Sequence, residues 1–224
     1  MTVSTASGSA AGAAPPLDDE TPKRPFTFGV AWLAALLIVG MLLGAGGALL
    51  ATRNVHPGDD SAEAGFLRDM STHHAQAVEM SMIAHANSAN PQIISLSADI
   101  ALTQHGQIGY MQAWLRDWSL NPTGSRPAMS WMPGSQGSVV NGLMPGMANP
   151  EQMAQLRKAT GKDLDVQFLT RMRQHHLGGI HMAQEVLRLS DNKDVTWLAD
   201  TMVTGQQGEI NLIDDLLKKV QAAG

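Results

Sequence analysis

Apolar side chains recur every three or four positions along four long stretches of this chain, the spacing that gathers them on one face of an α-helix. The stretches cover residues 61–87, 91–118, 163–189 and 195–220. They fall into two pairs, and a short turn joins the members of each pair. Two helical hairpins of this kind predict an all-α fold, an antiparallel four-helix bundle.

Turn and capping residues mark the ends of the expected helices. Asn90-Pro91 separates the first two, with Pro91 suited to the first helical position, and Asp191-Asn192 separates the last two. Between the hairpins, Asn149-Pro150-Glu151 is typical of a cap that opens a short extra helix, which we expect to reach about Ala159.

The two hairpins are similar in sequence. A shift of 102 positions lays residues 66–80 on residues 168–182 without a gap, and Phe, Leu, Met, a His-His pair and a later Met then coincide. The same shift lays Gln104 on Gln206 and Leu115 on Leu217. Because a His-His pair is rare, a gap-free match that includes one indicates an internal duplication.

The N-terminal quarter follows another pattern. Residues 1–25 are rich in Ala, Ser, Thr and Pro without periodicity, and we expect them to form a disordered cytoplasmic tail. Residues 26–52 carry no charged side chain and exceed the ~20 residues that cross a bilayer. They are also longer than the core of a usual signal peptide. We therefore expect a transmembrane signal anchor and then a linker over residues 53–61; cleavage after Ala51 is the alternative.

Charges on either side of this apolar segment indicate its orientation. Lys23 and Arg24 precede it, whereas Arg53 is soon followed by Asp59 and Asp60. The positive-inside rule then places the N-terminus in the cytoplasm and the bundle outside the cell membrane, in a single-pass protein. Glycines within the segment are also compatible with pairing of two such helices in the membrane.

A long connection joins the two hairpins of the predicted bundle. We expect the bundle to cover residues 62–221. Its first hairpin takes residues 62–119, the connection residues 120–161 and the second hairpin residues 162–221. The connection is rich in Pro, Gly, Ser and Met, and connections of this length are usually functional or disordered. Its Met and Trp residues either cover the end of the bundle or, at Met144 and Met147, offer two thioethers to Cu(I).

Composition narrows the chemistry that the chain can carry. The 224 residues have a formal net charge of −5 and no basic cluster, which argues against nucleic acid as a partner. Cysteine is absent, so disulfides, thiolate metal sites and cysteine nucleophiles are excluded. Methionine is frequent, with 14 residues. A metal site here must therefore use His, Met, carboxylate, amide or water ligands.

Histidine and methionine share one face of the first expected helix in each hairpin, at about 100° per residue. The residues on this face and at its edge are Met70, His73, His74, Met80, Met172, His175, His176 and Met182. Imidazole suits copper, zinc, iron and nickel, and thioether selects Cu(I). Met at this spacing is often core packing, and an inward His is often a hydrogen-bonding residue. The occurrence of the pattern in both copies favours a metal site.

Other polar residues extend the candidate site. We expect Gln104, Gln206 and Glu209 to hydrogen-bond the imidazoles or to supply an oxygen ligand. Three further histidines are weaker candidate ligands: His85, His105 and His181.

Two acid–histidine pairs have helical spacing. Asp69 precedes His73 by four residues, and His181 precedes Glu185 by four. Each pair either orients a metal ligand or forms an ion pair at the surface.

Together these motifs resemble a known family. The order is a Met-x-x-His-His-x-x-(Ala/Gly)-x-x-Met helix, a Gln-x-x-(Glu/Gln)-Ile helix, a Met-Pro-Gly-Met linker, and both helices again. Over Ala64 to about Lys219 this resembles the exported bacterial family called domain of unknown function 305. The resemblance implies a ferritin-like bundle, and copper binding by some periplasmic relatives implies a role in copper tolerance. By motif position, it implies that the eight His and Met residues named above are metal ligands, together with Met144 and Met147 in the linker.

The two copies differ at two positions that matter for such a site. The first has Gln107 where the second has Glu209, and Glu79 where the second has His181. We therefore expect either two unequal sites or one site and one relic.

Catalytic signatures are missing from the sequence. Ferritin-like di-iron enzymes use Glu-x-x-His pairs, and no such pair occurs in this chain. We expect a membrane-anchored extracytoplasmic protein that binds copper, or else zinc or another divalent ion, and that sequesters or transfers it. The alternative is a structural or accessory bundle of a membrane complex, in which the His pairs are hydrogen-bonding core residues. The sequence names no protein partner.

Overall fold

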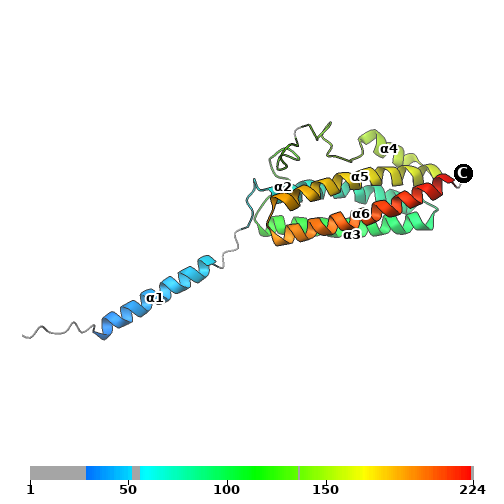
Figure 1. The fold of residues 1–224 in the computed structure, drawn as a ribbon. Coiled ribbons are helices and arrows are strands. Elements are labelled where there is room, and N and C mark those ends of the chain that lie inside the picture. Colours follow the sequence, from blue (N-terminus) through cyan, green and yellow to red (C-terminus); the bar gives the residue numbers. More distant parts are fainter. Residues whose placement is uncertain (1–28, 52–55, 136, 223–224) are drawn as a thin grey trace, which may run out of the picture. The chain divides into compact units, whose positions relative to one another are not determined.

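The computed structural model describes residues 29–51, 56–135 and 137–222, and these residues form six helices (Figure 1). The chain divides into two compact units, residues 1–54 and 55–224. The first unit contains α1 (Val30–Ala51), of which Val30–Ala48 is long and apolar enough to cross a membrane, with a mean hydropathy of 2.1. The expected tail over residues 1–25 lies outside the described residues.

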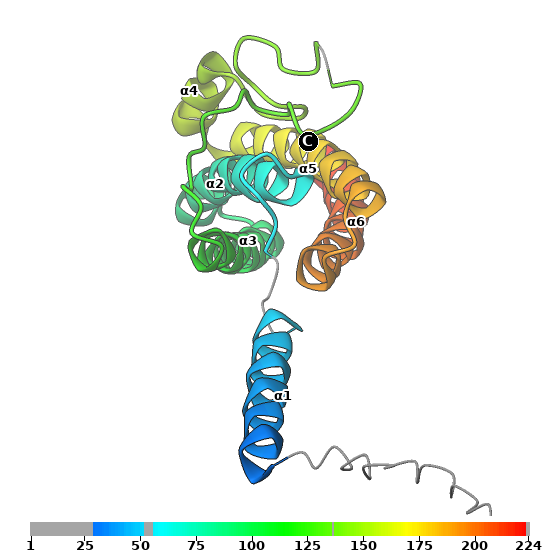
Figure 2. The same ribbon diagram turned by 90° about the vertical axis from the view of Figure 1, so that its left-hand side faces the viewer.

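The second unit is an all-α bundle, as the sequence predicts. Its helices are α2 (Ala62–Asn87), α3 (Pro91–Asp117), α4 (Pro150–Lys158), α5 (Gly161–Leu189) and α6 (Lys193–Ala222). Two hairpins, α2/α3 and α5/α6, pack through α2 and α5, whereas α3 and α6 touch only slightly. The view along the bundle shows α2 and α5 side by side between the covering linker and the α3/α6 side (Figure 2).

Local hydrogen bonds explain where the helices begin. The Asn90 side chain accepts the Gln92 N–H at 3.0 Å, and Asn149 opens α4 with a reciprocal capping box to Gln152. The Asn192 side chain accepts the first free N–H groups of α6. These caps confirm the expected helix starts at Pro91 and Pro150. Helices α5 and α6 each begin two residues before the position expected from apolar spacing.

The two hairpins make equivalent hydrogen bonds where they meet. Ser88, after α2, donates to Asp165 at 2.6 Å, and Ser190, after α5, donates to Glu63 at 2.6 Å. The two serines are 102 positions apart, and so are the two acids. Each hairpin therefore fastens its turn near the N-terminal end of the other hairpin's leading helix.

The core consists of two apolar clusters. The Phe66 cluster includes Phe66, Leu67, Met70, Met111, Leu115, Met144, Met182, Val186, Leu198 and Met202. The Phe168 cluster includes Ala77, Met80, Ile93, Leu96, Ile100, Leu164, Phe168, Met172, Ile213 and Leu216. Along each of the four long helices, one cluster gives way to the other at buried polar residues. We call these six residues the histidine layer: His73, His74, Gln104, His175, His176 and Gln206.

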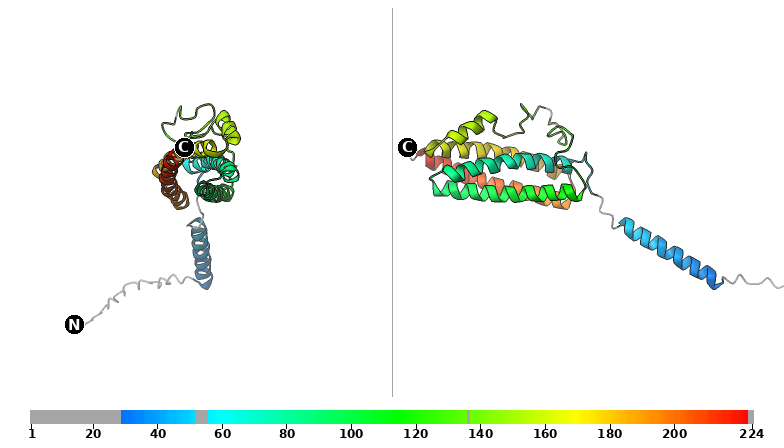
Figure 3. Two further views of the ribbon diagram at one scale, coloured as in Figure 1. Left: turned by 90° about the vertical axis from the view of Figure 1, so that its right-hand side faces the viewer. Right: turned by 180° about the vertical axis from the view of Figure 1, so that it is seen from behind.

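The linker between the hairpins packs along the α2/α5 face of the bundle (Figure 3). Asp69 of α2 holds it in place by accepting the Met129 N–H at 2.7 Å and the Trp131 indole N–H at 2.8 Å. The Trp131 ring stands edge-on to Phe66, with centroids 5.8 Å apart. It also covers Gly65, where a Cβ atom would lie 2.5 Å from the indole.

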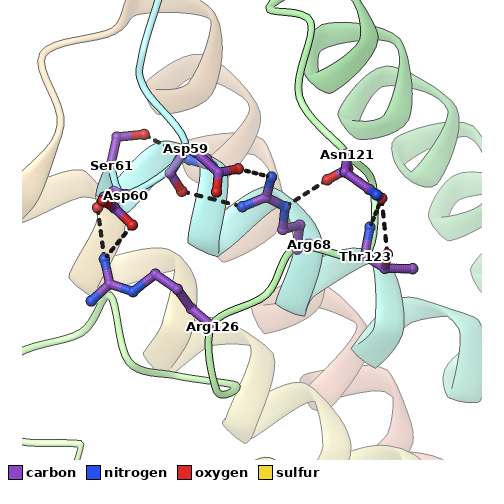
Figure 4. Close-up of polar contacts among 8 residues, drawn as sticks. Asp59, Asp60, Ser61, Arg68, Asn121, Thr123 and Arg126 are labelled. Atoms are coloured by element: carbon purple, nitrogen blue, oxygen red, sulfur yellow. Dashed lines mark hydrogen bonds and ion pairs between the residues drawn. The ribbon is translucent and has the colours of Figure 1, made fainter.

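Arg68 joins the start of this linker to the segment that precedes α2. Its guanidinium donates to the Asn121 carbonyl at 2.8 Å and to the Asp59 carbonyl at 3.2 Å, and it pairs with the Asp59 carboxylate (Figure 4). Arg126 makes a separate contact with the neighbouring Asp60 at 3.3 Å. The side chain of Arg68 is almost wholly buried, so these partners satisfy a charge that would otherwise be costly.

Candidate metal site in the histidine layer

Two histidines from different hairpins meet at the middle of the bundle. His73 of α2 and His175 of α5 have ring centroids 3.7 Å apart with the rings tilted by 33°. His175 donates its Nε2–H to the backbone carbonyl of His73 at 3.0 Å. Both side chains are buried, at 0% and 1% exposure. The duplicated position in each hairpin therefore contributes to one shared space.

The second histidine of each pair binds to the neighbouring helix of its own hairpin. His74 donates its Nε2–H to the Gln107 side-chain oxygen at 2.7 Å, and His176 donates its Nε2–H to the Glu209 carboxylate at 2.6 Å. The two contacts are equivalent under the shift of 102 positions. The carboxylate is the stronger acceptor, so the second hairpin presents its histidine with the more basic free nitrogen.

The linker breaks this equivalence at His73. Its Nε2–H donates to the carbonyl of Pro145 at 3.0 Å, rather than to the carbonyl of His175. The Pro145 carbonyl lies against α5 at Gly178, where a Cβ atom would be 1.9 Å away. Met144-Pro145-Gly146-Met147 therefore passes directly over the paired rings.

These contacts define the tautomer of the imidazoles. Each of the four donates from Nε2 to an oxygen that can only accept: two backbone carbonyls, an amide oxygen and a carboxylate. Nδ1 then carries the lone pair. In the part of the chain that the structure describes, Nδ1 of His73, His74 and His176 is buried without a hydrogen-bond partner. Each of these nitrogens is neutral with a free lone pair, the form in which an imidazole binds a metal ion.

Burial keeps three of the four rings uncharged, those of His73, His74 and His175. It lowers the pKa of His73 from 6.5 to about 4, and it lowers the pKa of His74 to about 3 with a further contribution from His73. Burial likewise lowers the pKa of His175 well below 6.5, and the neighbouring histidines add to the effect. At neutral pH the Nδ1 atoms of His73, His74 and His175 are therefore free of protons that would compete with a metal ion.

Candidate methionine ligands lie on both sides of the histidine layer. Met70 and Met182 belong to the Phe66 cluster, together with Met144 of the linker. Met80 and Met172 belong to the Phe168 cluster. The antiparallel packing of α2 and α5 thus brings together thioethers that stand at non-equivalent positions of the two copies. Met147 is half-buried against the Phe66 cluster.

The three weaker histidine candidates lie outside the buried layer. His85, His105 and His181 are all exposed, and His85 hydrogen-bonds the Ile94 carbonyl at 3.1 Å. Within the described ranges, no three His, Cys, Asp or Glu side chains converge closely enough to hold a metal ion. An ion bound by the imidazoles would therefore take its remaining ligands from thioethers, amides or water.

Of the three expected polar partners, Glu209 hydrogen-bonds an imidazole, that of His176. Gln104 and Gln206 do not, and Gln107, one turn beyond Gln104 along α3, binds His74 instead. Among the described residues, both polar atoms of Gln104 and the Oε1 atom of Gln206 are buried without a partner. They remain available as oxygen ligands. The repeat offered the signal for Gln107, because it occupies the position of Glu209.

The acid–histidine pairs expected from their spacing do not form either. Asp69 binds the linker instead of His73, and Glu185 pairs with Arg188 at 3.5 Å instead of with His181. In both cases the acid binds another group instead of the histidine one helical turn away. Burial raises the pKa of Asp69, whose carboxylate the linker donors only partly compensate.

Comparison with known proteins finds a matching family and similar structures. The family model named domain of unknown function, DUF305, matches residues 63–217. A crystal structure of a presumed secreted DUF305 protein from Streptomyces coelicolor is 41% identical, with a TM-score of 0.67, covering 73% of this chain and 96% of that one. A DUF305 fragment from Deinococcus radiodurans is 28% identical, with a TM-score of 0.59, covering 70% and 96%.

A more distant structure is that of CopM. Its Cu(II)-bound form is 23% identical, with a TM-score of 0.55, covering 74% of this chain and 99% of that one. Its Cu(I)-bound form is 21% identical, with a TM-score of 0.56, covering 71% and 96%. At this identity the likeness shows a shared fold. No curated protein sequence matches the chain.

Proposed function

This chain belongs to the DUF305 family, and from that premise we propose that its histidine layer binds a soft metal ion, copper foremost, in order to sequester it or pass it on. The observation that carries the proposal is the set of three buried Nδ1 atoms without partners, on His73, His74 and His176. A buried polar atom without a partner costs about 1–3 kcal/mol, and an ion bound by these nitrogens would offset that cost.

The ligand types favour copper over harder ions. Neutral imidazole nitrogens suit copper and zinc, whereas the adjoining thioethers of Met70, Met80, Met172 and Met182 favour Cu(I). With thiolate absent, thioether is the soft donor that this chain has. The likeness to CopM, which was solved with copper bound, agrees with this choice. Zinc or another divalent ion would use the imidazoles with Gln104, Gln206 or Glu209 oxygens.

The linker offers a second, softer place for the ion. Met144 and Met147 stand on either side of Pro145, whose carbonyl contacts His73. We propose that these two thioethers take part in Cu(I) binding or hand the ion to the buried imidazoles. The two hairpins would bind the metal ion with unequal strength, because His176 has a carboxylate partner and His74 has an amide partner.

We further propose that α1 anchors the protein in the cell membrane with the bundle outside. The support is the apolar span Val30–Ala48 and the charges flanking the apolar segment, Lys23 and Arg24 on one side and Asp59 and Asp60 on the other. The presumed secreted relative from Streptomyces coelicolor agrees with export. Whether the segment is retained or cleaved after Ala51 is decided by the mass of the mature protein.

A titration with matched variants tests metal binding. Full-length protein in detergent micelles is equilibrated by dialysis with Cu(I), Cu(II) or Zn(II), and bound metal is measured together with the melting temperature. We expect wild type to bind tightly and to melt at a higher temperature with metal, by mass action. The double variant His175→Ala, His176→Ala should lose tight binding and the shift while retaining helical circular dichroism. His105→Ala, which alters an exposed imidazole, is the control and should behave as wild type.

One observation favours a second function, a structural bundle that serves a membrane complex. Every imidazole in the layer already makes one hydrogen bond, and no three-residue His/Cys/Asp/Glu site is preformed in the described part of the chain. On this view the double variant would lower the melting temperature of metal-free protein, and its metal stoichiometry would equal that of wild type.

A further inference from the structure

The Met144–Ala148 segment, here called the strap, crosses the interface between α2 and α5 at the level of the histidine layer. His73 donates to the Pro145 carbonyl at 3.0 Å, so the strap is bonded to one of the candidate ligands. Met144 and Ala148 at its two ends are buried in the two different apolar clusters. The strap therefore spans the polar layer from one cluster to the other.

A second side chain of α2, Gln76, adds two hydrogen bonds to the strap. The Gln76 amide donates to the Ala148 carbonyl at 2.8 Å, and its oxygen accepts the Ala148 N–H at 2.7 Å. Position 76 corresponds to Gly178 under the shift of 102 positions. A Cβ atom at Gly178 would lie 1.9 Å from the Pro145 carbonyl oxygen. Thus α2 binds the strap through Gln76, whereas α5 leaves space for it at the equivalent position, Gly178.

The close approach of the strap to α5 also requires a glycine within the strap, Gly146. Gly146 has φ +82°, a conformation that disfavours other residues, and its Cα lies so close to α5 that a Cβ atom would be 2.4 Å from the Gln174 carbonyl. Glycine on both sides of the contact allows two backbones to touch. The strap is fitted to α5 by shape and held to α2 by hydrogen bonds.

This layer is closed to ions in the structure. Its six side chains are between 0% and 4% exposed, so an ion reaches the Nδ1 atoms only when a covering element moves. Parting two long helices would expose both apolar clusters. Lifting the strap breaks three side-chain hydrogen bonds and exposes its own residues, and local openings of this size are the ones that proteins sample most readily.

We infer that the strap is the gate through which metal ions enter and leave the histidine layer, with Gln76 as its catch; this inference rests on the proposed metal binding. Metal bound at Nδ1 leaves the Nε2–H of His73 free to keep its bond to Pro145. The strap therefore closes over the loaded site as it does over the empty one. A gate of this kind governs the rates of binding and release and leaves the affinity nearly unchanged.

A second route competes with this one. The Glu209 carboxylate is 21% exposed and touches His176, and α3 and α6 make little contact on that side of the bundle. An ion that entered past Glu209 would not depend on the strap. The two routes are separated by variants that alter the strap alone.

The test measures rates of Ag(I) binding to the full-length protein in detergent micelles. Association is followed by stopped-flow tryptophan fluorescence, and release by transfer to an excess of chelator. Gln76→Ala removes the catch, and Gly178→Ala pushes the strap away by its Cβ atom. Gln112→Ala, an exposed glutamine of α3, is the matched control. Hydrogen exchange over residues 144–148 reports the opening of the strap, and melting curves with circular dichroism verify folding.

We expect both strap variants to raise the association and release rates together by about tenfold or more, with Kd within about threefold of wild type, because Gln76→Ala removes two hydrogen bonds of the strap and Gly178→Ala displaces it. Hydrogen exchange at Ala148 should accelerate in parallel, and the control should match wild type. Faster exchange without faster silver binding would overturn the gate and point to entry past Glu209. Unchanged exchange in Gln76→Ala would overturn the role of the catch. Failure of wild type to take up silver at equilibrium would instead overturn the proposed function, and the gate with it.

Discussion

His175 donates a hydrogen bond to the backbone of His73, but His73 does not return it. The two residues are 102 positions apart and their rings are in contact, with centroids 3.7 Å from each other. In a symmetric pair each ring would bind the other's backbone carbonyl. His73 binds Pro145 of the linker instead, so the linker makes two otherwise equivalent ligands distinct.

The first prediction concerns the tautomer of this pair. Because Nε2 of both histidines donates to a carbonyl, we expect 15N spectra of metal-free protein at neutral pH to show a protonated Nε2 and a pyridine-type Nδ1 at His73 and His175. Addition of Ag(I) should then shift the Nδ1 signals of the layer and leave the Nε2 signals protonated. A shift at Nε2 with loss of its proton would mean that the ion displaces the hydrogen bonds instead.

The second prediction concerns acid. Burial lowers the pKa of His73 to about 4 and that of His74 to about 3, whereas both titrate near 6.5 in the unfolded chain. The unfolded state therefore binds more protons below pH 6.5, and the stability of the fold decreases as pH falls through that window. At pH 5 each of the two histidines should cost about 2 kcal/mol relative to neutral pH.

Urea denaturation of metal-free protein between pH 7.5 and 5 measures this loss. His74→Gln removes one titrating group and should flatten the pH dependence by about one proton. The exposed His105→Gln serves as the control and should follow wild type. A free energy of unfolding that stays constant from pH 7 to 5 would show that the buried rings do not remain neutral.

The third prediction separates the charge of Asp69 from its hydrogen bonds. Burial raises the pKa of this carboxyl, so its charge is unfavourable, while its oxygen accepts from Met129 and Trp131. Asp69→Asn keeps an accepting oxygen and should change the free energy of unfolding by less than about 1 kcal/mol. Asp69→Ala leaves two donors unsatisfied and should cost about 1–3 kcal/mol, with a change in tryptophan fluorescence. Equal losses in the two variants would assign the role to the charge.

The fourth prediction compares two adjacent glycines of α5. A Cβ atom at Gly178 meets the backbone of Pro145, whereas one at Gly179 meets the Gln206 side-chain oxygen at 2.6 Å, at the end of a flexible side chain. Gly178→Ala should therefore destabilise by about 1–3 kcal/mol, because the strap must shift. Gly179→Ala gains up to about 1 kcal/mol of helix propensity and should be neutral or stabilising, as Ala77 in the first hairpin suggests. Chemical denaturation of the two variants decides this, and the reverse order would be evidence against the docked strap.

The helices and their order could be predicted because the information for them is local. Apolar residues at helical spacing define the faces, and Asn90 and Asn149 bind the backbone two or three residues away whatever the rest of the chain does. The His pairs were likewise expected to point inward, because 100° per residue fixes which side chains share a face.

Other features depend on contacts between residues distant in the chain. Nothing near Asp69 indicates that it would bind Met129 rather than His73, and nothing near Gln76 indicates a clamp for Ala148. The choice of Gln107 over Gln104 as the partner of His74 follows from how α3 is rotated against α2. Such choices are decided by packing, since several groups of similar polarity compete for each donor and only the assembled bundle brings one of them within reach.

The amino-acid sequence alone thus determined an apolar N-terminal segment, two similar hairpins and the inward face that carries four histidines, because each depends on composition or helical period. The tertiary structure alone decided that these imidazoles form one layer between two apolar clusters, which nitrogen of each ring is free, and that the Met-Pro-Gly-Met segment covers them. Those properties arise where segments about 70 and 102 positions apart come together, and no local pattern encodes the geometry of that meeting.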